Sequence, residues 1–288
     1  MRTETYKYQL YILPSIFICG GIILYVMLNV FRLSFTAYTI PDPLSANKYI
    51  GFANYVFLPY DPLFVRSLTV TGIFVVVALS LELILGFFLA YLVFSLPKFS
   101  YIYRVIFSLP IMIMPLVSAY LFYMLFASGT MGWINAYLSL FFKTQIAWLS
   151  YPWTALFVLI MEHVYRYSTF AFLIFFAGFT SIPKDILDAS LMETVSEKQR
   201  IRYIYLPFLK PHIVTAAVLL LIDLLKVFDS IWIITGGGPE RFTELLNYYI
   251  FKTSFQLYHV GYGSAMATLI IIFLIIVTIL TIGRKMEV

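Results

Sequence analysis

Hydrophobic residues form six long runs along this chain, and polar or turn-forming residues bound each run. The runs lie near residues 10–31, 68–96, 102–127, 153–180, 213–235 and 265–283. Each reaches or approaches the roughly 20 residues that a helix needs to cross the hydrocarbon of a bilayer. The pattern predicts an all-α polytopic membrane protein, with six transmembrane helices in a single domain over residues 1–288.

Two features modify this picture. Pro110 and Pro115 lie in the third run, where each removes a backbone donor, so we expect a bend there. Between the fourth and fifth runs, the loop 182–211 has charges on one side and Ile186, Leu187 and Leu191 on the other. This predicts a short amphipathic helix outside the lipid, where it is available to a partner.

Composition supports the membrane assignment. Hydrophobic residues make up 62% of the 288 positions and charged residues 11%, against roughly 45–50% and 25% in soluble domains. Such an excess has to face membrane lipid. The net charge of +5 does not indicate nucleic-acid binding, because the basic residues are not gathered into one patch with interleaved aromatics.

The basic residues instead indicate orientation. Outside the runs or within three residues of their ends, eleven lysines and arginines lie on the same side as the N-terminus and six on the opposite side. The positive-inside rule then places both termini of this multi-pass protein in the cytosol. We expect the first run to be a retained helix, because it is too long for a typical signal core and no small-x-small cleavage site follows it.

Signatures of catalysis are weak. The histidines at 163, 212 and 259 have no metal-ligand spacing, and no phosphate-binding loop occurs. The run Gly236-Gly237-Gly238-Pro239 is typical of a turn. We therefore expect no metal or other cofactor in this chain, and no enzyme activity of its own.

Ionisable residues inside the runs are a stronger signal, since a charge at mid-bilayer costs at least about 2.5–3.5 kcal/mol. They are Glu82, Glu162, Arg166, Asp223 and Lys226. Glu162 and Arg166 are four residues apart, and Asp223 and Lys226 three apart, so each pair can meet on one helix face. Glu162 and Arg166 could either form a structural ion pair or line a water-accessible pathway, and the sequence leaves both interpretations open.

For Asp223 and Lys226 the pattern favours a pathway. Asp229 continues their stripe, and aromatic residues lie close by in sequence. Aromatic faces beside acidic groups suit sugar rings, which stack and form hydrogen bonds at once. The candidate pathway residues are Tyr165, Arg166, Asp223, Lys226, Asp229 and Trp232.

Particular motifs carry a family resemblance. Ile182-Pro183, then Asp188-Ala189-Ser190, Thr194 and finally Ile204-Tyr205-Leu206-Pro207 keep the spacing of the EAA motif in membrane subunits of bacterial ABC importers. Asp188 replaces the usual glutamate and Thr194 the usual glycine. The segments 13–14, 33–36, 51–55 with Asp61, 228–229, 235–239, 243–244, 255 and 261–265 resemble the carbohydrate-type, MalF-like branch of that family.

The resemblance implies a MetI-like permease fold and a permease subunit that forms half of the pathway for a sugar or oligosaccharide. It also implies three kinds of partner: a second permease, two nucleotide-binding ATPase subunits that hold ATP and Mg, and an extracellular solute-binding protein. The implied ATPase-coupling residues are Ile186, Leu187, Asp188, Ala189, Ser190, Leu191, Thr194 and Arg200.

Alternatives remain open at this point. The same machinery could import a sugar alcohol or a glycerol phosphate. A self-sufficient secondary transporter is disfavoured because we find no inverted repeats. A membrane enzyme would need a catalytic cluster near one interface, and Glu162 with His163 is the best available.

Overall fold

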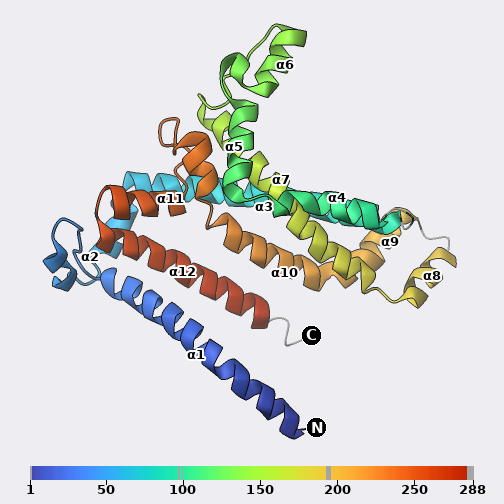
Figure 1. Cartoon of the computed structure of the whole chain (residues 1–288), viewed down its shortest axis with the longest axis horizontal. Helices are drawn as coiled ribbons and strands as arrows, with labels where there is room; N and C mark the ends of the chain where they lie inside the picture. The colour runs from blue at the N-terminus through green and yellow to red at the C-terminus, as the bar shows by residue number, and fades with distance from the viewer. Residues whose placement is uncertain (1, 97, 99, 193–195, 284–288) are drawn as a thin grey trace. The chain divides into compact units, whose positions relative to one another are not determined.

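The computed structural model describes residues 2–96, 98, 100–192 and 196–283 (Figure 1). Within these residues the chain is almost entirely helical, and the only strand-like pairings are two isolated bridges. The chain divides into two compact units. Unit 1 comprises residues up to 65 together with 249–273, and unit 2 comprises 66–248 together with the residues from 274.

Five helical segments of the described chain are long and apolar enough to cross a membrane, and one bent pair makes a sixth. Four of the predicted runs are single helices. They are α1 Arg2–Leu33, α3 Pro62–Ser95, α7 Pro152–Thr180 and α12 Val260–Gly283. The predicted all-α membrane fold is confirmed.

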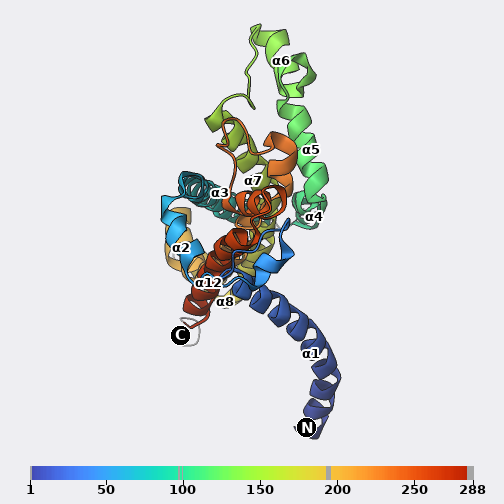
Figure 2. The same ribbon diagram turned by 90° about the vertical axis from the view of Figure 1, so that its left-hand side faces the viewer.

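The third run is the bent pair, formed by α4 Ser100–Met112 and α5 Pro115–Phe126 at an angle of 90°. Met114 between them is extended, with φ −56° and ψ 140°. Proline disfavours helical geometry in the residue before it, and Pro115 then begins the next helix. The predicted bend is confirmed, and Figure 2 shows α5 turning away from α4.

The fifth run differs from the prediction of one helix over 213–235. The long segment there is 197–224, which consists of α9 Glu197–Arg200, the π-helical turn η5 Ile201–Tyr205 and α10 Leu206–Leu224. Helix α10 ends there, and the chain then forms a separate π-helical turn, η6 Ile231–Thr235. Residues 227, 231 and 234 are apolar because they pack inside unit 2, and hydropathy alone does not separate that burial from exposure to lipid.

The remaining elements are short. They are η1 Pro43–Asn47, α2 Ala53–Phe57, η2 Leu58–Tyr60, η4 Gly129–Met131, α6 Trp133–Phe142, α8 Lys184–Met192, α11 Leu246–Phe251 and η7 Lys252–Gln256.

Helix α7 is the centre of unit 2, where it packs against both α4 and α10. Two apolar clusters lie along it, one around Phe74 and Leu159 and the other around Phe175 and Leu209. Glycine permits its close approach to α3, because a Cβ on Gly86 would lie 2.4 Å from the Cβ of an α7 alanine. The clusters hold α3, α7 and α10 together and so fix the polar side chains between them.

In unit 1, two N-terminal segments that resemble the family, 33–36 and 51–55, contact each other. The Asn54 side-chain amide donates to the carbonyl oxygens of Ser34, at 2.8 Å, and Thr36, at 3.0 Å. Gly261 begins α12 so close to this loop that a Cβ there would lie 2.2 Å from the Thr36 carbonyl oxygen. Segments distant in sequence therefore meet in one small loop cluster.

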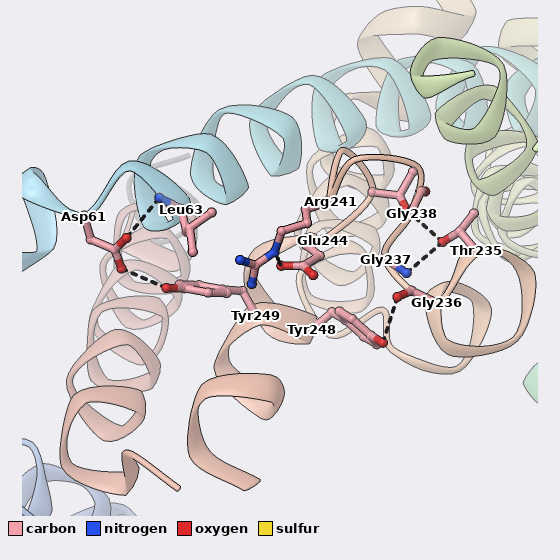
Figure 3. A network of polar contacts seen from close by, with 11 residues as sticks. Asp61, Leu63, Thr235, Gly236, Gly237, Gly238, Arg241, Glu244, Tyr248 and Tyr249 are labelled. Carbon is pink, nitrogen blue, oxygen red and sulfur yellow. Dashed lines mark hydrogen bonds and ion pairs between the residues drawn. The ribbon is translucent and has the colours of Figure 1, made fainter. Parts of the chain in front are cut away.

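Asp61 joins a second set of unit 1 elements (Figure 3). One carboxylate oxygen accepts from the backbone N–H of Leu63 at 2.9 Å, which caps the start of α3. The other accepts from the hydroxyls of Tyr249 at 2.8 Å and Tyr262 at 2.7 Å. Burial alone raises the pKa of Asp61, but these hydrogen bonds outweigh it, and the net result is a lowered pKa.

Candidate functional site

A cavity of about 90 Å³ lies in unit 2 beside the end of α10. Its lining comes from α5, α7, the last turn of α10 and the segment that follows α10. The lining residues are Pro115, His163, Arg166, Tyr167, Asp223, Lys226, Val227, Phe228, Asp229 and Ser230. This volume is smaller than the roughly 300–1,000 Å³ of small-molecule pockets.

Two ion pairs border this cavity. Lys226 Nζ lies 3.4 Å from Asp223 Oδ1, and Arg166 Nη1 lies 3.7 Å from Glu162 Oε1. Both pairs predicted from sequence spacing are confirmed. Asp229 makes no ion pair within the described residues, so its carboxylate is the cavity's uncompensated charge.

Deeper in unit 2, buried polar groups connect three helical segments. Ser230 Oγ donates to Glu162 Oε2 at 2.7 Å. His163 Nδ1 lies 2.6 Å from Glu82 Oε1, which joins α7 to α3. The His163 ring also stacks on Tyr167, with centroids 4.3 Å apart. Our sequence reasoning missed the contact between Glu82 and His163, although Glu82 was visible as an isolated charge in the second run.

Four of the six candidate pathway residues meet at this cavity: Arg166, Asp223, Lys226 and Asp229. The other two lie outside its lining. Tyr165 is 43% exposed and contacts the Phe122 ring, with centroids 5.7 Å apart. Trp232 is 50% exposed and stacks on Phe228 at 5.9 Å. The aromatic side chains at the cavity are instead Tyr167 and Phe228.

The predicted amphipathic segment is helical and comprises α8 and α9. Ile186, Asp188 and Ala189 on α8 are exposed. Leu187 instead packs against the apolar cluster around Phe175, and Ser190 is buried, with Oγ donating to the Leu187 carbonyl at 2.6 Å. The apolar side of α8 is thus divided between the chain's own core and its outer face.

The remaining predicted coupling residues are Arg200, Leu191 and Thr194. Arg200 pairs with Glu197 on α9. A capping box of Ser196 and Gln199 starts that helix. The side chain of Leu191, and Thr194 as a whole, lie outside the described residues.

The glycine run forms the predicted turn in unit 2 (Figure 3). Gly236 and Gly237 have φ values of +58° and +88°, which side chains rarely adopt. The buried Thr243 hydroxyl donates to the Gly238 carbonyl at 2.6 Å. Tyr248 donates to the Gly236 carbonyl at 3.2 Å, and burial together with the charge of Glu244 raises the pKa of Tyr248.

Long apolar helices with a polar cavity among them define a multi-pass membrane protein. The family model for the binding-protein-dependent transport system inner membrane component matches residues 82–285. The chain belongs to this family of transport subunits. The predicted membership of the ABC importer permeases is confirmed.

Similar proteins extend the match over most of the chain. A probable ABC transporter permease protein of Pyrococcus horikoshii is 29% identical over 94% of this chain and 92% of its own length. The trehalose/maltose transport system permease protein MalF of Thermococcus litoralis is 32% identical over 82% of this chain and 80% of its own.

A solved structure shares the fold. A chain in the crystal structure of a bacterial alginate ABC transporter, in complex with an alginate pentasaccharide-bound periplasmic protein, matches with a TM-score of 0.82 at 20% identity. The match covers 97% of this chain and 93% of that chain. The MetI-like permease fold implied by the sequence motifs is confirmed.

Proposed function

We propose that this chain forms half of the translocation pathway of an ATP-driven importer for a sugar or oligosaccharide. An extracellular solute-binding protein delivers the solute. The carrying observation is the cavity beside the end of α10, where charged, hydroxyl and aromatic side chains converge inside an otherwise apolar bundle. The relative named for trehalose and maltose and the solved alginate transporter support a solute built from sugar rings.

The charges support a hydrated route. An unpaired carboxylate such as Asp229 is costly against lipid, whereas a water-filled pathway keeps it solvated. The cavity of about 90 Å³ in this chain alone is too small for a sugar. A second permease facing it supplies the other wall of a full-sized site.

Thiol labelling tests this pathway. Single cysteines replace Asp223, Lys226 and Asp229 in a Cys19→Ser background, which removes the native thiol. We expect a membrane-impermeant thiol reagent to modify at least one of them in some state of the transport cycle. Ala119→Cys is the control, because Ala119 is fully buried in the apolar core. If the three cysteines stay unlabelled, with and without nucleotide, while transport persists, these residues do not line the route.

We assign α8 and α9 to the cytosolic side, where they contact an ATPase subunit that binds ATP and Mg. Both termini lie on the same side, as the distribution of basic residues predicts. Ile186, Asp188 and Ala189 form the docking face, because they are exposed while Leu187 and Ser190 face the chain's own core. Arg200, Leu191 and Thr194 remain predicted members of this contact.

Copurification tests this face. Ile186→Asp places a charge in the contact and should abolish copurification of the ATPase without reducing membrane insertion. Ile146→Asp is the matched control, since the side chains of Ile186 and Ile146 are 36% and 38% exposed. Ile146 precedes α7 and Ile186 follows it, so about 44 Å of helix separates them. Undiminished ATPase binding by Ile186→Asp would contradict the assignment.

Reconstitution without a second permease tests whether this chain needs one. One chain with one docking segment engages only one of two ATPases. Reconstitution with the ATPase but without a second permease should give no hydrolysis stimulated by the loaded binding protein. Transport by that preparation would instead establish a homodimer.

A further inference from the structure

The contact between Glu82 and His163 has unusual surroundings for two ionisable groups. Glu82 is fully buried and His163 is 2% exposed. Their single mutual contact is the 2.6 Å approach of Oε1 to Nδ1. Glu82 Oε2 and His163 Nε2 are buried and have no hydrogen-bond partner within the described part of the chain. His163 is among the residues that line the cavity, and Nε2 is its one ring nitrogen that does not contact Glu82.

Charge decides how the pair holds its proton. A buried carboxylate is stable when several donors or a well-bonded cation compensate it. Glu82 Oε1 contacts His163 Nδ1, and Glu82 Oε2 has no hydrogen-bond partner within the described residues. An imidazolium at His163 would also lie three residues from the Arg166 guanidinium on the same face of α7, where like charges repel. The neutral arrangement avoids both costs: a protonated Glu82 donates to Nδ1, and the imidazole proton sits on Nε2.

We propose that Glu82 is a positioning residue, which fixes His163 as the tautomer that presents an Nε2–H donor to the cavity. The hydrogen bond at one ring nitrogen determines which proton the other carries. The ring cannot swing freely, because it stacks on Tyr167 and meets Phe74 edge to face at 5.8 Å. This proposal rests on the proposed pathway.

The proposed donor differs from the four charged groups of the cavity. Asp223 and Asp229 only accept hydrogen bonds when ionised, while Arg166 and Lys226 donate as charged groups. Nε2–H is a neutral donor, suited to a hydroxyl or ring oxygen of a passing saccharide and to water between passages. A neutral donor orients such an oxygen without the tight binding that would slow release.

Nitrogen spectroscopy of the complete transporter tests the tautomer directly. The chain is labelled with ¹⁵N-histidine, and His212→Gln with His259→Gln leaves His163 as its only histidine. In nanodiscs at pH 7 we expect a pyridine-type Nδ1 and a pyrrole-type Nε2 whose proton correlates with water. A pyrrole-type Nδ1, or two pyrrole-type nitrogens, would overturn the proposal.

Substitutions at Glu82 test the transport consequence with maltose as the probe. Glu82→Gln keeps a neutral donor for Nδ1 and should leave uptake within about twofold of wild type. Glu82→Leu removes the donor and should lower uptake about three- to tenfold, the effect of one hydrogen bond. In a His163→Leu background, Glu82→Leu should add no further loss, because Glu82 acts through His163.

The outcomes separate the two proposals. Equal loss in Glu82→Gln and Glu82→Leu, or additive losses in the double variant, contradict the positioning role. A wild-type transporter that takes up no maltose contradicts the choice of that saccharide, while the nitrogen spectrum still decides the tautomer.

Discussion

Replacing Gly86 with alanine should destabilise unit 2 at the crossing of α3 and α7. A Cβ on Gly86 would lie 2.4 Å from the Ala171 Cβ and 2.9 Å from the Phe172 backbone nitrogen. Carbon atoms pack favourably at about 3.5–4.0 Å, so the helices have to separate by more than about 1 Å. Both contacts lie on or beside helical backbone, which cannot rotate away as a side chain does.

The magnitude follows from two opposing effects. Overpacking a well-packed core costs about 1–3 kcal/mol. Alanine is a better helix former than glycine by about 1 kcal/mol. We therefore expect a net loss of roughly 1–2 kcal/mol. Glu82 is four residues before Gly86 on α3, so the separation should also weaken its contact with His163.

Denaturation of the protein in nanodiscs, followed by tryptophan fluorescence, measures this loss. Gly72→Ala is the matched control, because it makes the same substitution on the same helix, where a Cβ meets nothing within 4 Å. It should be neutral or slightly stabilising. If Gly86→Ala is as stable as Gly72→Ala, the close crossing of α3 and α7 is wrong.

Three further predictions concern single polar groups. Asp61 has a lowered pKa, so its contribution to stability is complete above its unfolded pKa near 3.8 and is lost as the pH falls through the folded value; acid titration of Asp61→Asn should lack this loss. Thr243→Ala removes the hydroxyl bound to Gly238 and should cost about 1–3 kcal/mol, with faster proteolysis of the turn than in Thr243→Ser. Ser230→Ala leaves Glu162 Oε2 without its donor; a similar loss is expected by denaturation, and none in Ser230→Thr.

The sequence predicted features with a local cause. Prolines set the bend between α4 and α5, where Met114 becomes extended. The glycine run predicted the turn after η6, since Gly236 and Gly237 need positive φ. The charges gathered at the cavity were also foreseeable, because mid-run ionisable residues are costly anywhere else.

Features that depend on distant parts of the chain were not predictable in the same way. The partner of His163 is 81 residues away in sequence, and helical spacing carries no information on that scale. The division of α8 is similar: a helical pattern places Ile186 and Leu187 on its apolar side, but only packing shows that Leu187 faces the core. Tyr165 and Trp232 lie outside the cavity lining for the same reason, since their positions depend on tertiary packing.

The end of α10 explains why the charges and the helix break coincide. The last four carbonyl groups of a helix have no partner in the helix, and here the end lies against apolar residues, with Leu224 1% exposed and Val227 9% exposed. The Leu225 N–H donates to the Leu221 carbonyl and the Lys226 N–H to the Asp223 carbonyl, which satisfies two of these four groups. The Asn247 side-chain amide donates to the Lys226 carbonyl, just beyond the helix, at 3.0 Å. Non-helical backbone at membrane depth persists where it is buried in protein or lines a water-filled space. The break at the end of α10 borders the cavity, so the proposed hydrated pathway would keep Asp223, Lys226 and Asp229 solvated at the position where the helix ends.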